Sequence, residues 1–301
     1  MSKKFFKKLA MALGILTCVS IPTSAFADIK GEYPSGEILS FGSDLSDSQE
    51  AQLREQFKAP DNIEAIYVDS KMAIKQFGLD EKELANFTGG WYSSAYVKLL
   101  QKESGVKVTS SNLTLVTNDM LANALITSGI LNADVMASAP FPVTGESALA
   151  GILAGAENIM GGELSTSNKQ AAQKEIDVSL DLAEEVGDTE ASAIINEVKT
   201  TVIKDKPSSE KEIKEIVEKV ENKYDVNISA NIQDNMVSLM SDINNLDLDY
   251  SKLKDTLDKS ASKFKEEMSA LGKELKDSGF FDKLFNWIKD FFNSIFNSSE
   301  G

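Results

Sequence analysis

The chain has 301 residues with 47 acidic and 31 basic side chains, a formal net charge of −16 and no histidine. This excess of acid argues against a surface that binds nucleic acid or anionic lipid, because both require a positive patch. The lack of histidine excludes a Ser-His-Asp or Cys-His catalytic arrangement, imidazole metal ligands and imidazole acid–base catalysis. Enzyme chemistry would have to use carboxylates, Lys, Tyr, Ser or Thr.

Residues 1–27 have the parts of a secretory signal peptide. Four lysines precede a short apolar run from Leu9 to Ile21, and the small residues Ala25 and Ala27 form a signal-peptidase site. The run is too short to span a bilayer well, which makes an anchor helix the weaker interpretation. We predict a secreted or extracellular, envelope-associated protein whose signal peptide is cleaved after Ala27.

Cys18 is the only cysteine and lies within the apolar run. Lipidation at Cys18 is an alternative to cleavage, but Thr17 fits poorly before a lipidated cysteine, and the site ending at Ala27 explains more of the segment. Cleavage would remove the cysteine, so the mature chain would have no disulfide and would depend on a packed core.

Strand patterns alternate with short helix patterns over residues 37–162, after an exposed leader at 28–36. Strand-like or extended segments are predicted at 37–45, 62–70, 91–100, 104–117 and 133–140. The third has alternate residues on one face: Trp91, Ser93, Ala95, Val97 and Leu99. Helices are predicted at 48–57, 70–79, 118–130 and 147–162, with Ser46 as an N-cap and glycines at 78, 129 and 161 as stop signals. The alternation predicts a layered α/β lobe.

Residues 163–278 are rich in Lys, Glu, Asp and Ala and predict helices at 168–186, 189–204, 209–224, 233–245 and 250–277. One competing strand pattern occurs at 226–232. The longest helix has a coiled-coil-like seam, which we expect to pack within the chain rather than to self-associate: Leu253, Leu257, Ala261, Phe264, Met268, Leu271 and Leu275. The predicted fold class is α+β, an α/β-like layered N-terminal lobe followed by a mainly helical C-terminal region.

Residues 279–301 form a separate C-terminal segment in which 280–296 predicts an amphipathic helix. Its aromatic side includes the candidate contact residues Phe281, Phe285, Trp287, Ile288, Phe292 and Phe296. Its length and polar side argue against a membrane span. Docking on the protein's own core is slightly favoured, and peripheral membrane or partner contact is the alternative.

Several stretches carry a resemblance to a known family: GSDLSDSQEAQL, SSAYVKLL, GVKVTSSNLTLVT and NALITSGILNADVMASAPFPVTGESALAG, with YDVNIS and LDLDYSKL further on. They are similar to a YpuA-like family of secreted Gram-positive proteins, classed as a domain of unknown function. The similarity covers most of the mature chain. It implies an exported or envelope-facing protein and implies neither an activity nor catalytic residues. At Glu146 the chain departs from the family, which more often has a hydroxyl residue there.

The stretch APFPVTGESALAG, residues 139–151, most resembles an active-site turn. A nucleophile elbow around Ser147 would need a second glycine, but Leu149 stands in its place and no histidine can act as base. We therefore interpret the stretch as a turn in which Thr144 caps a helix and Glu146 faces the helix N-terminus. Small residues should let that helix pack closely on the sheet: Ala148, Ala150, Gly151, Ala154, Gly155 and Ala156.

Two weaker patterns contain residue types suited to chemistry. The Ser-x-x-Lys matches at 208–211 and 260–263 lie in charged helical segments and are interpreted as chance. Asp247 and Asp249 imitate the first ligands of a calcium loop, although the loop's glycine and final glutamate are missing. They remain candidate calcium ligands, with helix capping between the core residues Leu246 and Leu248 as the favoured interpretation. No other metal or cofactor is predicted.

Aromatic residues at 91, 92 and 96 suit a sugar-stacking platform, although core packing is the default for a strand. The 47 acids make any single pair of carboxylates uninformative. We therefore predict a secreted, envelope-facing binding or structural protein that is not an enzyme. Its expected partner is a cell-wall or envelope component and not nucleic acid. The alternative is a carboxylate-dependent hydrolase acting on a cell-wall glycan.

Overall fold

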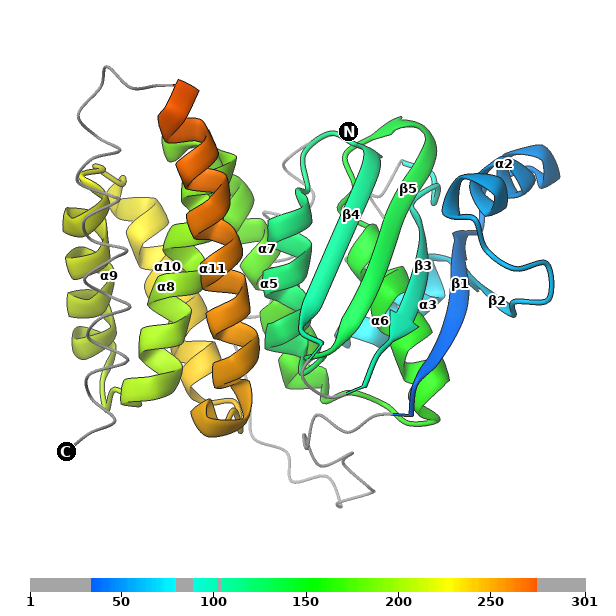
Figure 1. Ribbon diagram of the computed structural model, residues 1–301. Helices are drawn as coiled ribbons and strands as arrows, with labels where there is room; N and C mark the ends of the chain where they lie inside the picture. The colour runs from blue at the N-terminus through cyan, green and yellow to red at the C-terminus, as the bar shows by residue number, and fades with distance from the viewer. Residues whose placement is uncertain (1–33, 80–88, 102–103, 275–301) are drawn as a thin grey trace. The chain divides into compact units, whose positions relative to one another are not determined.

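The computed structural model describes residues 34–79, 89–101 and 104–274 (Figure 1). The chain divides into two compact units, Met1–Leu180 and Asp181–Gly301. The sequence placed the change from the lobe to the helical region at residue 162, whereas this division falls within helix α7 (Thr166–Val186). The α+β class is confirmed.

The first unit is built on a five-stranded sheet of order β2-β1-β3-β5-β4. Its strands are β1 (Gly36–Gly42), β2 (Ala65–Val68), β3 (Ser94–Leu99), β4 (Val106–Leu113) and β5 (Ala133–Val143). β1 runs parallel to β2 and β4 runs parallel to β5, while β3 is antiparallel to both of its neighbours. The carboxyl ends of β1, β2, β4 and β5 therefore lie at one edge of the sheet, the top edge in Figure 1.

One face of the sheet carries a helical layer, made of α3 (Ser70–Phe77), α5 (Asn118–Ser128) and α6 (Ala148–Met160) (Figure 1). Helix α6 packs on β1 and β3 because its glycines face those strands: a Cβ at Gly151 would lie 2.6 Å from Ser40 Oγ, and one at Gly155 3.0 Å from Ile38 Cγ2. The predicted close packing of the small residues in α6 is confirmed.

The opposite face is covered only in part among the described residues. Helix α2 (Asp47–Phe57) buries Leu53 and Phe57 against the β1 and β3 side chains Leu39, Phe41 and Tyr96. Its predicted cap at Ser46 forms a complete capping box with Gln49. The predicted glycine stops at α3, α5 and α6 are also confirmed, since each helix ends at a left-handed glycine.

The second unit is helical, with α8 (Asp188–Asp205) packed against α9 (Glu210–Tyr224), α10 (Ala230–Asn244) and α11 (Tyr250–Glu274). All four helices match predicted segments. Leu253 and Leu257 of the predicted α11 seam are buried within this unit, and α11 packs on α8.

The strand pattern at 226–232 was a wrong prediction. Helix α9 ends at Tyr224, its C-cap residue Asp225 is left-handed, and α10 begins at Ala230. The Glu221 carboxylate accepts hydrogen bonds from the Ile228 amide at 2.9 Å and from Gln233 Nε2 at 2.6 Å. In this turn between two helices, the Ile228 amide therefore donates to a side chain and not to a neighbouring strand.

Candidate functional site

Strand β5 ends in a bulge at the carboxyl edge of the sheet. Ser111 of β4 pairs with Ser138 of β5, and the next pair is Leu113 with Val143. Between these two pairs, the single β4 residue Asn112 lies opposite four residues of β5, the segment 139–142, Ala-Pro-Phe-Pro. Bulges of this kind redirect side chains and are frequent beside functional sites.

Hydrogen bonds from Asn112 of β4 and from Thr114, just after β4, hold both ends of the bulge. Asn112 adopts a left-handed conformation, φ 60°, which asparagine tolerates better than most residues. Its Nδ2 donates to the Ala139 carbonyl at 2.7 Å, and the Thr114 amide donates to the Val143 carbonyl at 2.8 Å. Because proline fixes φ, Pro140 and Pro142 further restrict the segment between these bonds.

Phe141 is the residue that the bulge displays. The residue is 39% exposed, and the Tyr92 ring packs against the Phe141 ring with centroids 4.9 Å apart and planes inclined by 61°. Tyr92 is positioned by the chain at 90–92, which passes so close to β1 that a Cβ on Gly42 would lie 2.0 Å from the Trp91 carbonyl oxygen. Asp44 closes this contact, since its Oδ2 accepts the Trp91 amide at 2.7 Å.

A group of uncharged polar side chains lies beside the bulge. Gln56 of α2 donates from Nε2 to Ser111 Oγ at 2.6 Å and to Ser138 Oγ at 3.1 Å, and the two hydroxyls are 2.9 Å apart. This group joins α2 to β4 and β5. Together with the aromatic residues it forms what we call the rim cluster: Gln56, Trp91, Tyr92, Ser111, Ser138 and Phe141.

Further along the same face, a row of alternating charges crosses four strands. Glu37 pairs with Lys98, Lys98 with Asp134, and Asp134 with Lys107. Opposite charges on neighbouring strands stabilise a solvated sheet face. This row therefore has a structural explanation.

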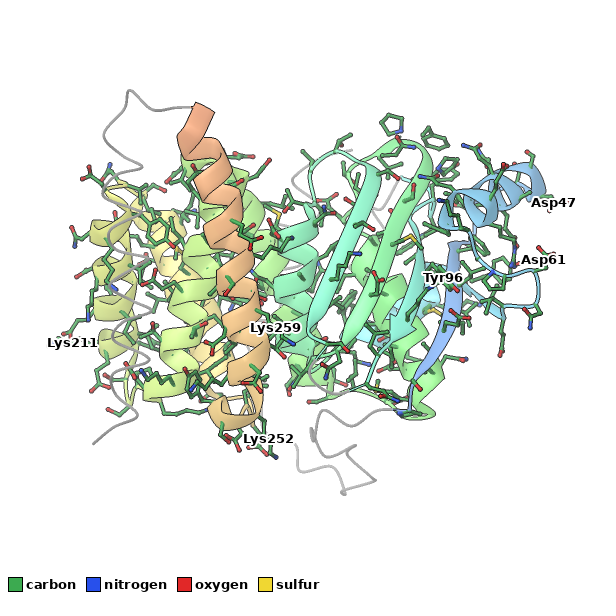
Figure 2. The ribbon with its side chains drawn as sticks, viewed as in Figure 1. Asp47, Asp61, Tyr96, Lys211, Lys252 and Lys259 are labelled. Carbon is green, nitrogen blue, oxygen red and sulfur yellow. The ribbon has the colours of Figure 1, made fainter. Side chains whose placement is uncertain are left out.

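Tyr96 of β3, which is labelled in Figure 2, contacts two members of this row. Its hydroxyl donates to Glu37 Oε2 at 2.5 Å, and Lys98 Nζ lies 4.5 Å from the ring centroid. Burial, followed by the hydrogen bond to Glu37, raises the pKa of the phenol above its usual range. Tyr96 therefore stays protonated and ties β1 to β3, which confirms core packing as its default role and removes it from a stacking platform.

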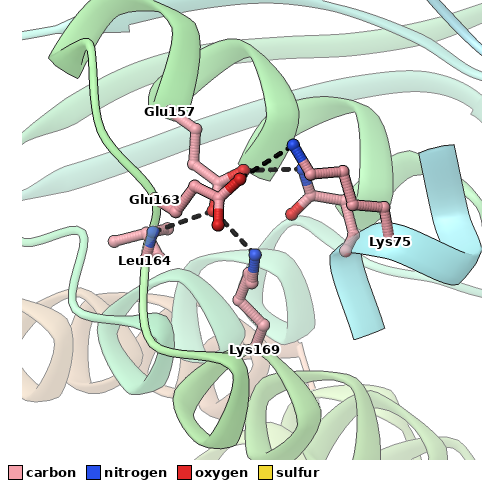
Figure 3. A network of polar contacts seen from close by, with 6 residues as sticks. Lys75, Glu157, Glu163, Leu164 and Lys169 are labelled. Atoms are coloured by element: carbon pink, nitrogen blue, oxygen red, sulfur yellow. Dashed lines mark hydrogen bonds and ion pairs between the residues drawn. The ribbon is translucent and has the colours of Figure 1, made fainter. Parts of the chain in front are cut away.

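A second polar network joins α3, α6 and α7 within the first unit (Figure 3). Glu157 accepts hydrogen bonds from Gln76 Nε2 at 2.7 Å, the Leu164 amide at 2.8 Å and Lys169 Nζ at 2.7 Å. Lys75 and the neighbouring Glu163 form a more exposed ion pair at 2.8 Å. Because the Glu157 carboxylate is held by three donors, we assign this network to stability.

The turn at Ser147 has no nucleophile geometry. Ser147 is the N-cap of α6 but makes no capping hydrogen bond. The prediction that Thr144 caps this helix is wrong. Instead, the Thr144 carbonyl accepts the amides of Leu115 and Val116 at 3.2 and 3.1 Å and so fastens the turn to the segment that follows β4. Burial raises the pKa of the Glu146 carboxyl, against the opposing hydrogen bond from Thr144.

The calcium candidates do not come together in a ligand cluster. Asp249 accepts hydrogen bonds from the Ser251 amide and hydroxyl at 2.8 and 2.7 Å, which lowers its pKa and caps α11. Asp247 is exposed, and the flanking Leu246 and Leu248 are buried as predicted. Within the described ranges no group of three or more His, Cys, Asp or Glu side chains is placed to hold a metal ion.

The remaining sequence candidates do not form a site either. Ser208 hydrogen-bonds to Glu212, while Lys211 pairs with Glu215, so the serine and lysine of this match have separate partners. The predicted contact residues lie outside the described ranges: Phe281, Phe285, Trp287, Ile288, Phe292 and Phe296. No helix within the described ranges is both long and apolar enough to cross a membrane.

Sequence reasoning missed the polar half of the rim cluster. Gln56 lies 55 residues from Ser111 along the chain, so no local pattern joins them. The signal available was Pro-Phe-Pro inside a strand pattern, because proline in a strand marks an edge or a bulge.

Comparison with known proteins agrees with the resemblance noted in the sequence. The family model described as "Protein of unknown function (DUF1002)" matches residues 41–260. A relative described as "Uncharacterized protein YpuA", from Bacillus subtilis (strain 168), is 28% identical over 303 residues, which cover 99% of this chain and 98% of that protein. No solved structure matches the chain.

Proposed function

Because the chain belongs to the DUF1002 family, a family of unknown function, we propose a role from its own residues: it is an exported, non-enzymatic protein that binds a cell-envelope component through the rim cluster. The observation that carries this proposal is the exposed ring of Phe141 on a segment fixed by two prolines and by bonds from Asn112 and Thr114. Aromatic side chains contribute strongly to binding, and a ring held rigidly loses little entropy when a ligand is bound.

Export is the second part of the proposal and rests on the lysines, apolar run and small residues of 1–27. The mature protein is then expected to begin at Asp28 outside the cytoplasm. N-terminal sequencing of the extracellular protein tests this. A first residue of Cys18, carrying lipid, would contradict cleavage after Ala27.

The alternative of a carboxylate-dependent glycan hydrolase has less support at this site. The rim cluster contains no carboxylate, and the neighbouring Asp44 is engaged with the Trp91 amide. Glycoside hydrolysis requires two carboxyl groups facing the scissile bond. Hydrolase activity is therefore treated as an alternative outcome of the sacculus experiment described next.

The experiment is co-sedimentation of the mature protein with purified wall sacculi. Phe141→Ala should lose most of the sedimented fraction because it removes the exposed ring. Tyr67→Ala is the matched control, since Tyr67 is also an exposed aromatic residue of the first unit, 53% exposed, and lies on β2. Equal sedimentation of the Phe141 variant and the wild type, or no sedimentation of either, would overturn the proposal.

The same incubations test the alternative. Soluble fragments released from the sacculi, with release abolished by a single carboxylate-to-amide substitution, would support the hydrolase. Sedimentation without release supports binding.

We also propose that the predicted amphipathic helix at 280–296 contributes to envelope association. Truncation after Ser278 removes the predicted amphipathic helix and is expected to leave a folded, soluble protein that loses the part of its envelope association that this helix provides. Cell fractionation and thermal melts of both forms test this. An unchanged distribution with a large fall in melting temperature would assign 280–296 to the protein's own core.

A further inference from the structure

We infer that the rim cluster recognises an uncharged, hydroxyl-rich carbohydrate chain; this inference rests on the proposed function and names the ligand class. Three properties of the cluster support it: an exposed ring, neutral hydrogen-bonding groups next to that ring, and the absence of formal charge among its six members.

The exposed ring supplies a stacking surface. Tyr92 meets Phe141 at a steep angle, which supports the ring from one side and leaves 39% of the Phe141 residue exposed. The C–H groups on one face of a sugar ring carry partial positive charge and are attracted to the electron-rich face of an aromatic ring. A single rigid ring of this kind suits one sugar unit better than it suits a wide apolar partner.

Gln56 and Ser111 are exposed and supply groups suited to sugar hydroxyls, whereas Ser138 is buried and helps to hold Gln56 in place. Gln56 uses Nε2 for both serines, and its Oε1 enters no hydrogen bond among the described residues. A hydroxyl can both donate and accept, so Ser111 can adapt to either role of a sugar hydroxyl. Ser138 precedes Phe141 by three residues of extended chain, so their Cα atoms are within roughly 10 Å of each other.

The lack of charge argues against other ligands. An anionic polymer or an anionic membrane would be attracted by lysine or arginine, and the rim cluster has neither. A cation would be held by carboxylates, and the cluster has none. Neutral amide, hydroxyl and aromatic groups match neutral carbohydrate.

The test is a titration of the ¹⁵N-labelled mature protein with chitotetraose and with cellotetraose, two uncharged oligosaccharides that differ in their N-acetyl groups. Amide shifts at Trp91, Tyr92, Phe141 and Val143 are expected with one or both. The Phe141→Ala variant should lose the shifts. Gln56→Ala should weaken binding at least 5-fold, and the exposed Gln52→Ala on the same helix should leave it unchanged.

Thermal melts of each variant separate loss of binding from loss of fold. No shift at about 10 mM of either sugar, a concentration that reveals a Kd of about 1 mM, would overturn the carbohydrate assignment. If sacculi still retained the protein in a Phe141-dependent manner, the proposed binding function would stand and only the ligand class would be wrong. If Phe141→Ala sedimented like the wild type, the proposed function itself would fail.

Discussion

Lys169 Nζ lies 2.7 Å from Glu157 Oε1, and both side chains are almost fully buried, 3% and 9% exposed. The pair joins the first turn of α7 to the last turn of α6. A second pair nearby, Lys75 with Glu163, has a similar distance of 2.8 Å but side chains that are 68% and 66% exposed. Comparing the two pairs therefore separates the effect of burial on stability from the effect of the distance between the charged atoms.

We predict that Lys169→Ala destabilises the first unit by about 3 kcal/mol, because a buried carboxylate then loses its cation. Lys75→Ala is the control and should cost less than about 1 kcal/mol, since its charge is solvated. Urea unfolding followed by Trp91 fluorescence or by amide exchange of β3 measures both. Equal losses for the two variants would contradict the role assigned to burial.

For the glycines of α6, we predict a change in stability on substitution by alanine that is opposite to the one expected from helix propensity alone. Gly-to-Ala inside a helix usually stabilises by up to about 1 kcal/mol. Gly151→Ala should instead destabilise by about 1–3 kcal/mol, because the new Cβ would lie 2.6 Å from Ser40 Oγ. The double variant with Ser40→Ala should recover much of the loss, and Gly162→Ala, whose Cβ would meet nothing within 4 Å, should be nearly neutral.

The two helix starts beside the bulge should respond differently to alanine. Thr117 accepts the Met120 amide at 3.2 Å, so Thr117→Ala should cost about 1 kcal/mol. Ser147 makes no capping bond, so Ser147→Ala should cost less than about 0.5 kcal/mol. Sacculus binding by the Ser147 variant should also stay within a few-fold of wild type. Loss of an activity by orders of magnitude in a folded Ser147 variant would make this residue a nucleophile.

Glu197, in the middle of α8, gives the helical unit a dependence on pH. Burial raises the pKa of its carboxyl from the usual 4.5 to about 7, against the opposing effects of Lys223, Tyr224 and Lys219 of α9. Lys223 Nζ lies 3.1 Å from Glu197 Oε1. Because the folded state holds the proton more tightly than the unfolded chain, this group's stabilisation is complete below about pH 4.5 and is lost as pH rises through about 7.

We predict that Glu197→Gln removes this dependence. Relative to wild type, the variant should gain on the order of 3 kcal/mol between about pH 4.5 and pH 8, from 1.36 kcal/mol per pKa unit. Urea unfolding followed by helical circular dichroism at several pH values measures the difference. Glu212→Gln is the control, since hydrogen bonds from the Ser208 amide and hydroxyl lower the pKa of exposed Glu212, and any effect should have the opposite sign. Parallel stability curves for wild type and Glu197→Gln would contradict the prediction.

Local sequence rules were enough to predict most helices and strands of the two units. Ser46, Gly78 and Gly129 mark helix ends through local rules, because a cap bonds within one turn and only glycine enters the left-handed region at little cost. The small residues of α6 likewise predicted a close contact with the sheet. At 226–232 the local pattern failed, since Glu221 of the preceding helix holds that segment as a turn.

The position of the candidate site, in contrast, depends on packing between distant segments of the chain. The bulge in β5 depends on pairing with Asn112 of β4, and the rim cluster depends on Gln56 reaching Ser111 and Ser138, which are 55 and 82 residues away. The burial of Glu157 and Glu197 is likewise set by helices that pack around them. Local sequence specifies turns, caps and periodicity, whereas exposure and proximity arise from packing between distant segments, and binding depends on those two properties.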